Sequence, residues 1–165
     1  MGRELAGVNL ARVFSSPMSR ARETAECIVG LADGPEVELV AGIAEQDFGD
    51  FEGMYAEEVA GLAPDWWRVG HSVDPASVEP GADVVARARG ALEQGWEGVA
   101  LAVGHGVCWR LLLCELLDMP LGSFRKLKLD TCGAAIVTIH GAGVSRVVAV
   151  NVPSLRLFVD RLSVA

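Results

Sequence analysis

The hydrophobic pattern is clearest in the middle of the chain, where an apolar run stops at Gly-His-Gly and a leucine-rich stretch follows. The run Val99–Val103 predicts a buried strand, and the stretch from Cys108 to Leu117 predicts a helix. His105 therefore lies at a strand-to-helix turn, where open α/β sheets bind their ligands. The unpaired N–H groups that open the helix favour an anion beside the imidazole, and phosphate is the natural candidate. A plain loop histidine with a satisfied hydrogen bond is the alternative.

A second strand-to-helix pair is predicted near the start of the chain. Residues 2–7 can be the tail of a helix, and residues 8–14 form an extended segment. Ser16 is the expected N-cap of the next helix and Pro17 its first residue, because proline fits that position. Arg20 then begins the helix at the carboxyl end of a strand, although an arginine in a helix is usually just solvated.

An acidic loop follows a short strand at residues 37–40. The loop, GIAEQDFGDFEGM, is neither helical nor alternating, and it carries Glu45 among several carboxylates spaced by aromatic and glycine residues. It could be an exposed loop that two phenylalanines hold in place. The functional alternative is a carboxylic acid held near a phosphate and able to give a proton to a leaving oxygen.

The remaining pattern predicts a single α/β domain over residues 1–165. Helices are expected at 55–62 and 83–94, and an irregular excursion at 71–81 could cover the site as a lid. Strands at 133–139 and 144–150 should form a hairpin, with His140 in its turn. The alternation predicts a three-layer sandwich: a mostly parallel central sheet, helices on both faces, and an antiparallel strand from the hairpin.

Composition narrows the function classes. The net charge of −8 argues against nucleic acid as a partner, because nucleic acid selects basic faces. The chain has no apolar stretch long enough to span a membrane and no visible signal peptide. The four cysteines lack metal-binding spacing, so no zinc or other metal site is expected. They are interpreted as reduced, buried thiols of a cytoplasmic protein.

Three segments together resemble one family, the histidine phosphatase (phosphoglycerate mutase-like) superfamily. They are SSPMSRARETAE, EQDFGDFEG and VGHGVCWRLLL, and they occur in the family's order between Gly2 and Asn151. The resemblance implies that Arg20 binds the transferred phosphoryl group, that Glu45 is the general acid and base, and that His105 hydrogen-bonds the phosphoryl oxygens. It also implies phosphate-binding positions for Ser16 and Gly106, and no cofactor or metal.

The chain departs from the family in one respect. Members begin with a strand that ends in Arg-His-Gly, whose histidine is the phosphorylated nucleophile, and this sequence has no Arg-His-Gly. Truncation at the N-terminus is favoured over true loss, because the first residues already read as the middle of a helix. The missing strand is central in the family's sheet, so its neighbours should be left unpaired around an open apolar cleft, which could favour a homodimer.

The resemblance therefore implies a phosphomonoester hydrolase that works through a phosphohistidine on a small phosphorylated substrate. The alternatives are an inactive phosphate-binding or scaffold protein of the same fold, and a phosphoglycerate mutase. Mutases carry a longer basic insertion for a second phosphate, whereas residues 55–82 here contribute only Arg68 as a full cation. A phosphatase is thus favoured, and the identity of its substrate stays open.

Overall fold

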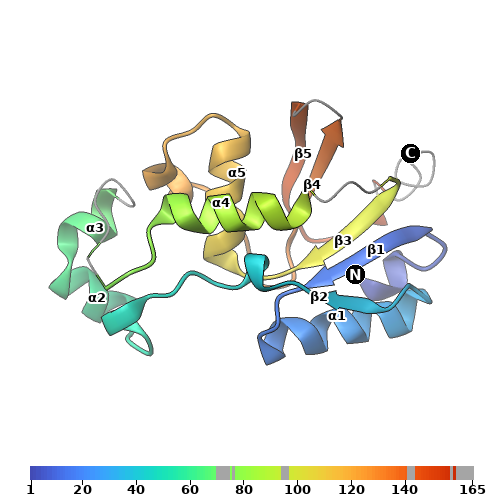
Figure 1. Ribbon diagram of the computed structural model, residues 1–165, viewed down its shortest axis with the longest axis horizontal. Helices are drawn as coiled ribbons and strands as arrows, with labels where there is room; N and C mark the ends of the chain where they lie inside the picture. Colours follow the sequence, from blue (N-terminus) through green and yellow to red (C-terminus); the bar gives the residue numbers. More distant parts are fainter. Residues whose placement is uncertain (70–74, 76, 94–96, 141–143, 157, 159–165) are drawn as a thin grey trace.

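The computed structural model describes residues 1–69, 75, 77–93, 97–140, 144–156 and 158. Its strands form a parallel sheet of order β2–β1–β3 and a separate antiparallel pair, β4–β5 (Figure 1). The strands are β1 (Leu10–Ser15), β2 (Val37–Leu39), β3 (Val99–Val103), β4 (Ala134–His140) and β5 (Val144–Val152). All the predicted strands are therefore present, and the α/β class is confirmed.

Helices connect the parallel strands and cover the sheet. The α-helices are α1 (Ser19–Ala32), α2 (Ala56–Leu62), α3 (Pro64–Val69), α4 (Gly81–Leu92) and α5 (Gly106–Leu116). Short 3-10 turns are η1 (Gly2–Glu4), η2 (Ala41–Ile43), η3 (Gly49–Phe51) and η4 (Leu121–Lys126). None of the helices in the described part of the chain is long and apolar enough to cross a membrane.

The alternation of side chains along β1 divides the core between the two faces of the sheet. Val13 is fully buried in a cluster with Ala25 and Ile28 of α1. Its neighbour Phe14 packs on the opposite side against α4 and α5, where Leu111 is fully buried. Figure 1 shows α1 on one side of the parallel sheet and α4 and α5 on the other. The predicted sandwich, with helices on both faces, follows from this arrangement.

The register of β1 and β3 determines which turns meet. Ser15 pairs with Val103, so both strands end at the same level. The N–H of Ser16 then donates to the carbonyl oxygen of Val103 across 2.9 Å. Because parallel strands present their carboxyl ends on one edge of the sheet, the segment after β1 and the Gly-His-Gly turn after β3 become neighbours.

The first helix begins later than predicted. The prediction of Ser16 as N-cap and Pro17 as first helical residue is wrong, because α1 starts at Ser19 with Met18 as its N-cap. The hydroxyl of Ser16 instead lies 2.8 Å from the ring of His105 and accepts a 3.3 Å hydrogen bond from the N–H of Met18. Near the N-terminus, the expected helix tail is only the turn η1.

Other differences concern the second half of the chain. Residues 64–69 form the short helix α3, which weak periodicity had left unassigned. The hairpin pairs only within itself among the described residues, so its strands do not join the parallel sheet. Cys108 and Cys114 are buried as predicted, but Cys27 and Cys132 are exposed. Residues 71–74 and 76 of the predicted lid lie outside the described residues, as does the hairpin turn at 141–143.

Candidate functional site

Arg20, Glu45 and His105 line one cavity of about 620 Å³, although they lie far apart in the sequence. Arg20 is on the first turn of α1, Glu45 follows η2, and His105 directly precedes α5. The cavity also contains Gly106, the first residue of α5. The fold thus brings together the residues that the sequence singles out. Ser16 is fully buried and outside this lining, so it reaches the cavity only through His105.

His105 is a buried imidazole between opposing charges. Only 6% of its surface is exposed, and its Nε2 lies 2.8 Å from the hydroxyl oxygen of Ser16. Burial lowers the pKa of His105 below its usual value of 6.5 because charging the ring costs solvation. Glu45 opposes this decrease, while the positive charge of Arg20 adds to it. Burial therefore favours the neutral imidazole, which carries one N–H.

Glu45 is held at the N-terminus of α5. Its Oε1 accepts a 2.9 Å hydrogen bond from the N–H of Cys108, and its Oε2 accepts one of 3.3 Å from Val107. The N–H of Gln46 adds a third hydrogen bond, 3.1 Å from Oε1. The N–H groups of Val107 and Cys108 are among those that a helix N-terminus leaves without intrahelical partners. An anion in the cavity would therefore meet the carboxylate of Glu45 already in position, with Gly106 beside it.

Arg87 fixes the loop that carries Glu45, a positioning contact that sequence reasoning missed. From α4 its guanidinium donates to the carbonyl oxygens of Gly42, Ala44 and Glu45 across 2.8, 2.9 and 3.1 Å. The same group forms an ion pair of 2.7 Å with Glu79. One side chain thus satisfies three carbonyls of an irregular segment, which explains how a loop without regular structure holds Glu45 in place.

The cavity continues along the sheet beyond the charged residues. It runs past Ala100–Val103 of β3 and also includes Ala134, Ala135, Val137 and Ile139 of β4. Among the described residues β3 pairs only with β1, and β4 pairs only with β5. The cavity therefore combines a polar end, at Arg20, Glu45 and His105, with an apolar groove between two strands.

Comparison with known proteins identifies the family. The family model described as histidine phosphatase superfamily (branch 1) matches residues 1–153. The chain belongs to this superfamily. No curated protein matches the chain. The histidine phosphatase match covers the segments that carry Arg20, Glu45 and His105.

Solved structures agree with this fold. YhfR of Bacillus stearothermophilus is 27% identical with a TM-score of 0.77, covering 89% of this chain and 76% of its own. A mycobacterial glucosyl-3-phosphoglycerate phosphatase, in complex with inorganic phosphate, is 22% identical with a TM-score of 0.76, over 94% and 84% of the two chains. The alpha-ribazole phosphatase of Shigella flexneri is 19% identical with a TM-score of 0.70, over 93% and 81%. At these identities the last two demonstrate a shared fold.

Proposed function

We propose that this histidine phosphatase superfamily member hydrolyses phosphomonoesters of small molecules. The observation that carries the proposal is the convergence of Arg20, Glu45 and His105 on one cavity at the N-terminus of α5. Phosphoryl transfer spreads negative charge over three equatorial oxygens, so the site needs fixed cations and donors. Arg20 supplies a planar guanidinium that matches phosphate, and the neutral ring of His105 supplies a hydrogen-bond donor.

The reaction would proceed in two steps through a phosphohistidine. In the first, an imidazole nitrogen forms a bond to phosphorus, the bond to the ester oxygen breaks, and Glu45 gives the leaving oxygen its proton. In the second, Glu45 accepts a proton from water, whose oxygen bonds to phosphorus as the N–P bond breaks. His105 would bind the phosphoryl oxygens in both steps. The attacking histidine is absent from this sequence, which contains no Arg-His-Gly.

A strand that carries the missing histidine could lie in the groove between β3 and β4. It is an apolar slot bordered by strand edges, and one end opens at His105. An additional strand in the groove would be parallel to β3 if it ended, as β3 does, beside the site. A histidine that followed such a strand would reach the phosphate from the side opposite β1. We therefore propose that the chain as given binds phosphate but turns over slowly or not at all.

The test is hydrolysis of p-nitrophenyl phosphate in the presence of a chelator. We expect the chain to bind inorganic phosphate but to lose turnover by orders of magnitude, as removal of a nucleophile does elsewhere. A version extended at the N-terminus by a strand ending in Arg-His-Gly should hydrolyse the ester. Glu45→Gln in that version should slow poor leaving groups more than good ones, because they need the proton most.

Two other outcomes would contradict the proposal. Rapid turnover by the unextended chain, with phosphate found on His105, would make His105 the nucleophile. Phosphate binding without turnover in the extended version would favour the second candidate function, a phosphate-binding protein of the same fold. Turnover by the extended version would exclude that candidate.

A further inference from the structure

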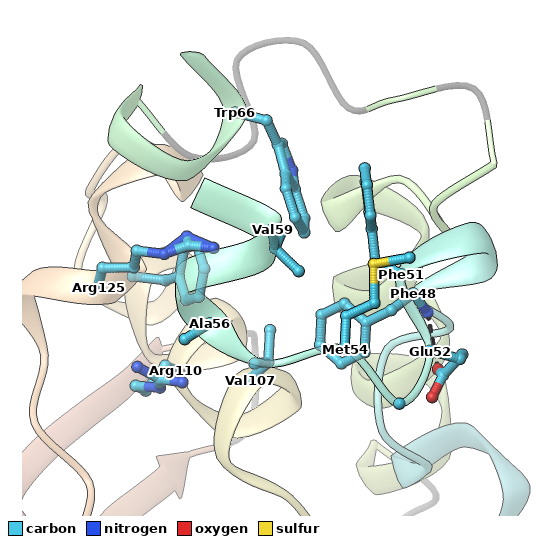
Figure 2. A pocket seen from close by; sticks show the side chains of 12 residues that line it. Phe48, Phe51, Glu52, Met54, Ala56, Val59, Trp66, Val107, Arg110 and Arg125 are labelled. Carbon is cyan, nitrogen blue, oxygen red and sulfur yellow. Dashed lines mark hydrogen bonds between the residues drawn. The ribbon is translucent and has the colours of Figure 1, made fainter. Parts of the chain in front are cut away.

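A second cavity, of about 480 Å³, borders the first turn of α5 without including Arg20, Glu45 or His105. Its walls come from the loop after Glu45, from α2 and α3, and from α5 and η4 (Figure 2). A volume of this size is typical of small-molecule sites. The functional site described above does not account for this cavity.

One wall of the second cavity is aromatic and held rigidly. Trp66 is 5% exposed and belongs to a small core with Val59 and Val78. Its ring stacks on Phe51 with centroids 5.5 Å apart and meets the edge of Phe48 at 6.5 Å. Figure 2 shows Phe48 and Phe51 across the cavity from Arg110 and Arg125, while the ring centre of Trp66 lies 5.3 Å from the guanidinium of Arg125. Flat apolar surfaces of this kind bind planar or aliphatic groups at little cost in side-chain entropy.

The other wall carries two half-buried arginines. Arg110 donates from Nε to the carbonyl oxygen of Gly106 across 2.8 Å, and its guanidinium lies 5.2 Å from the ring centre of Phe124. The guanidinium of Arg125 lies 4.5 Å from the ring centre of Phe124 and 5.3 Å from that of Trp66. Burial and the nearby charge of Arg110 together lower the pKa of Arg125 to about 10. An anion bound between the two guanidinium groups would relieve this repulsion.

The second cavity adjoins the catalytic carboxylate. Val107 contributes to its lining, and the N–H of the same residue donates to Oε2 of Glu45 across 3.3 Å. The charge of Glu45 also raises the pKa of Arg110, against the effect of burial, so the two groups lie within electrostatic range. Glu45 is the group that would protonate the leaving oxygen. The part of a substrate attached to that oxygen would therefore extend toward this cavity.

We propose that the second cavity binds the leaving group of the substrate and selects one with an apolar or aromatic body and a single carboxylate. The proposal rests on the proposed function and assigns its substrate class. Among the described residues, two positive side chains, Arg110 and Arg125, line the cavity with one negative side chain, Glu52. The net charge of this lining is thus matched by a monoanion, whereas a second phosphate would bring two charges. Carboxylate geometry also suits the planar guanidinium fork.

Calorimetric titration of the chain with 2-naphthoate tests the proposal without requiring turnover. We expect 2-naphthoate to bind at least tenfold more tightly than its neutral analogue 2-naphthalenemethanol. It should also bind more tightly than 2-naphthylphosphonate. Arg125→Met should weaken 2-naphthoate binding at least tenfold, while Arg125→Lys retains most of it and shows that the cavity still forms. Arg22→Met is the matched control, because Arg22 is exposed on α1 and pairs only loosely with Glu26, at 3.7 Å.

Separate titrations with inorganic phosphate distinguish this inference from the proposed function. Phosphate binding without 2-naphthoate binding would overturn the leaving-group assignment and leave the phosphate site intact. The converse result would support the carboxylate cavity and contradict the phosphate site. Equal affinity for 2-naphthoate and 2-naphthalenemethanol, unchanged by Arg125→Met, would overturn the role of the arginines. Tighter binding of 2-naphthylphosphonate would overturn the choice of a carboxylate.

Discussion

His105 owes its chemistry to its surroundings. The ring is buried beside Ser16, and the charges of Arg20 and Arg87 act on it in the same direction as burial. All three effects favour the neutral imidazole, and only Glu45 favours the charged form. A phosphate in the cavity would add negative charge beside the ring and shift this balance back. If phosphate binds as proposed, we expect His105 to take up a proton more readily in the complex than in the free protein.

This arrangement predicts that folding stability falls as the pH decreases through about 6.5. The pKa of His105 is lowered in the folded state, so the unfolded chain binds more protons below its own pKa and acid favours unfolding. His105→Asn can still hydrogen-bond to Ser16 but does not titrate, so it should lose less stability between pH 7 and pH 5. Urea unfolding of both proteins at several pH values measures this. An identical pH dependence in the two proteins would contradict the prediction.

The sequence predicted those site residues that follow a strand. Arg20, Glu45 and His105 each follow a strand, and the structure places all three on one cavity. Arg87 and Arg110 give no comparable signal, because an arginine in a helix is usually solvated. The available clue for Arg110 was its place in an otherwise apolar stretch, one turn after the Gly-His-Gly turn. Arg87 contacts carbonyl groups that are distant in the sequence. Arg110 contacts Gly106 on its own helix and Phe124 beyond it.

At the scale of elements, the turn η3 fixes the loop that lines the second cavity. Gly49 has a φ of +53°, and a Cβ there would lie 1.8 Å from the carbonyl oxygen of Ser77. Gly53 has a similar positive φ of +79° but nothing within 4 Å of its Cβ position. Both glycines therefore have a left-handed backbone, but only Gly49 is also closely packed. The tight approach at Gly49 holds the loop against the segment that precedes α4.

Gly49→Ala should therefore destabilise the protein far more than Gly53→Ala. The second substitution carries only the cost of a left-handed backbone, about 1 kcal/mol. The first adds displacement of Ser77, and we expect a total loss of roughly 3 kcal/mol or more. It should also weaken 2-naphthoate binding by moving Phe48 and Phe51. Chemical denaturation of both variants provides the comparison, and equal losses would show that Ser77 moves away easily.

The elements themselves were mostly predictable because their periodicity is strong. The strand at 99–103 and the helix α4 appear close to their predicted bounds. The start of α1 was misplaced because the local cap signal of Ser16 competes with a long-range partner, His105, that the sequence does not show. The helix α3 was missed because six residues carry too little periodicity to be distinguished from a loop.

At the scale of the whole molecule, a groove separates β3 from β4. The sequence predicted an open apolar cleft beside unpaired strands. The lining of the groove includes Leu112, Leu113 and Leu116 of α5 beside the edge of β3. A strand edge that faces an apolar groove has N–H and C=O groups available for pairing with another segment. The predicted joining of the hairpin to the parallel sheet fails here, because the hairpin strands lie across the groove from β3.

Hydrogen exchange along β3 can test this description of the groove. In a parallel strand, successive N–H groups point to opposite sides, so alternate amides of β3 bond to β1 and the others face the groove. We expect the groove-facing amides between Val99 and Val103 to exchange roughly a hundredfold faster than their neighbours in a monomer. A strand ending in Arg-His-Gly, added upstream, should slow them to the same rate. Equal protection of all these amides in a monomer would contradict an open edge, whereas protection that appears only as concentration rises would indicate pairing between two copies of the chain.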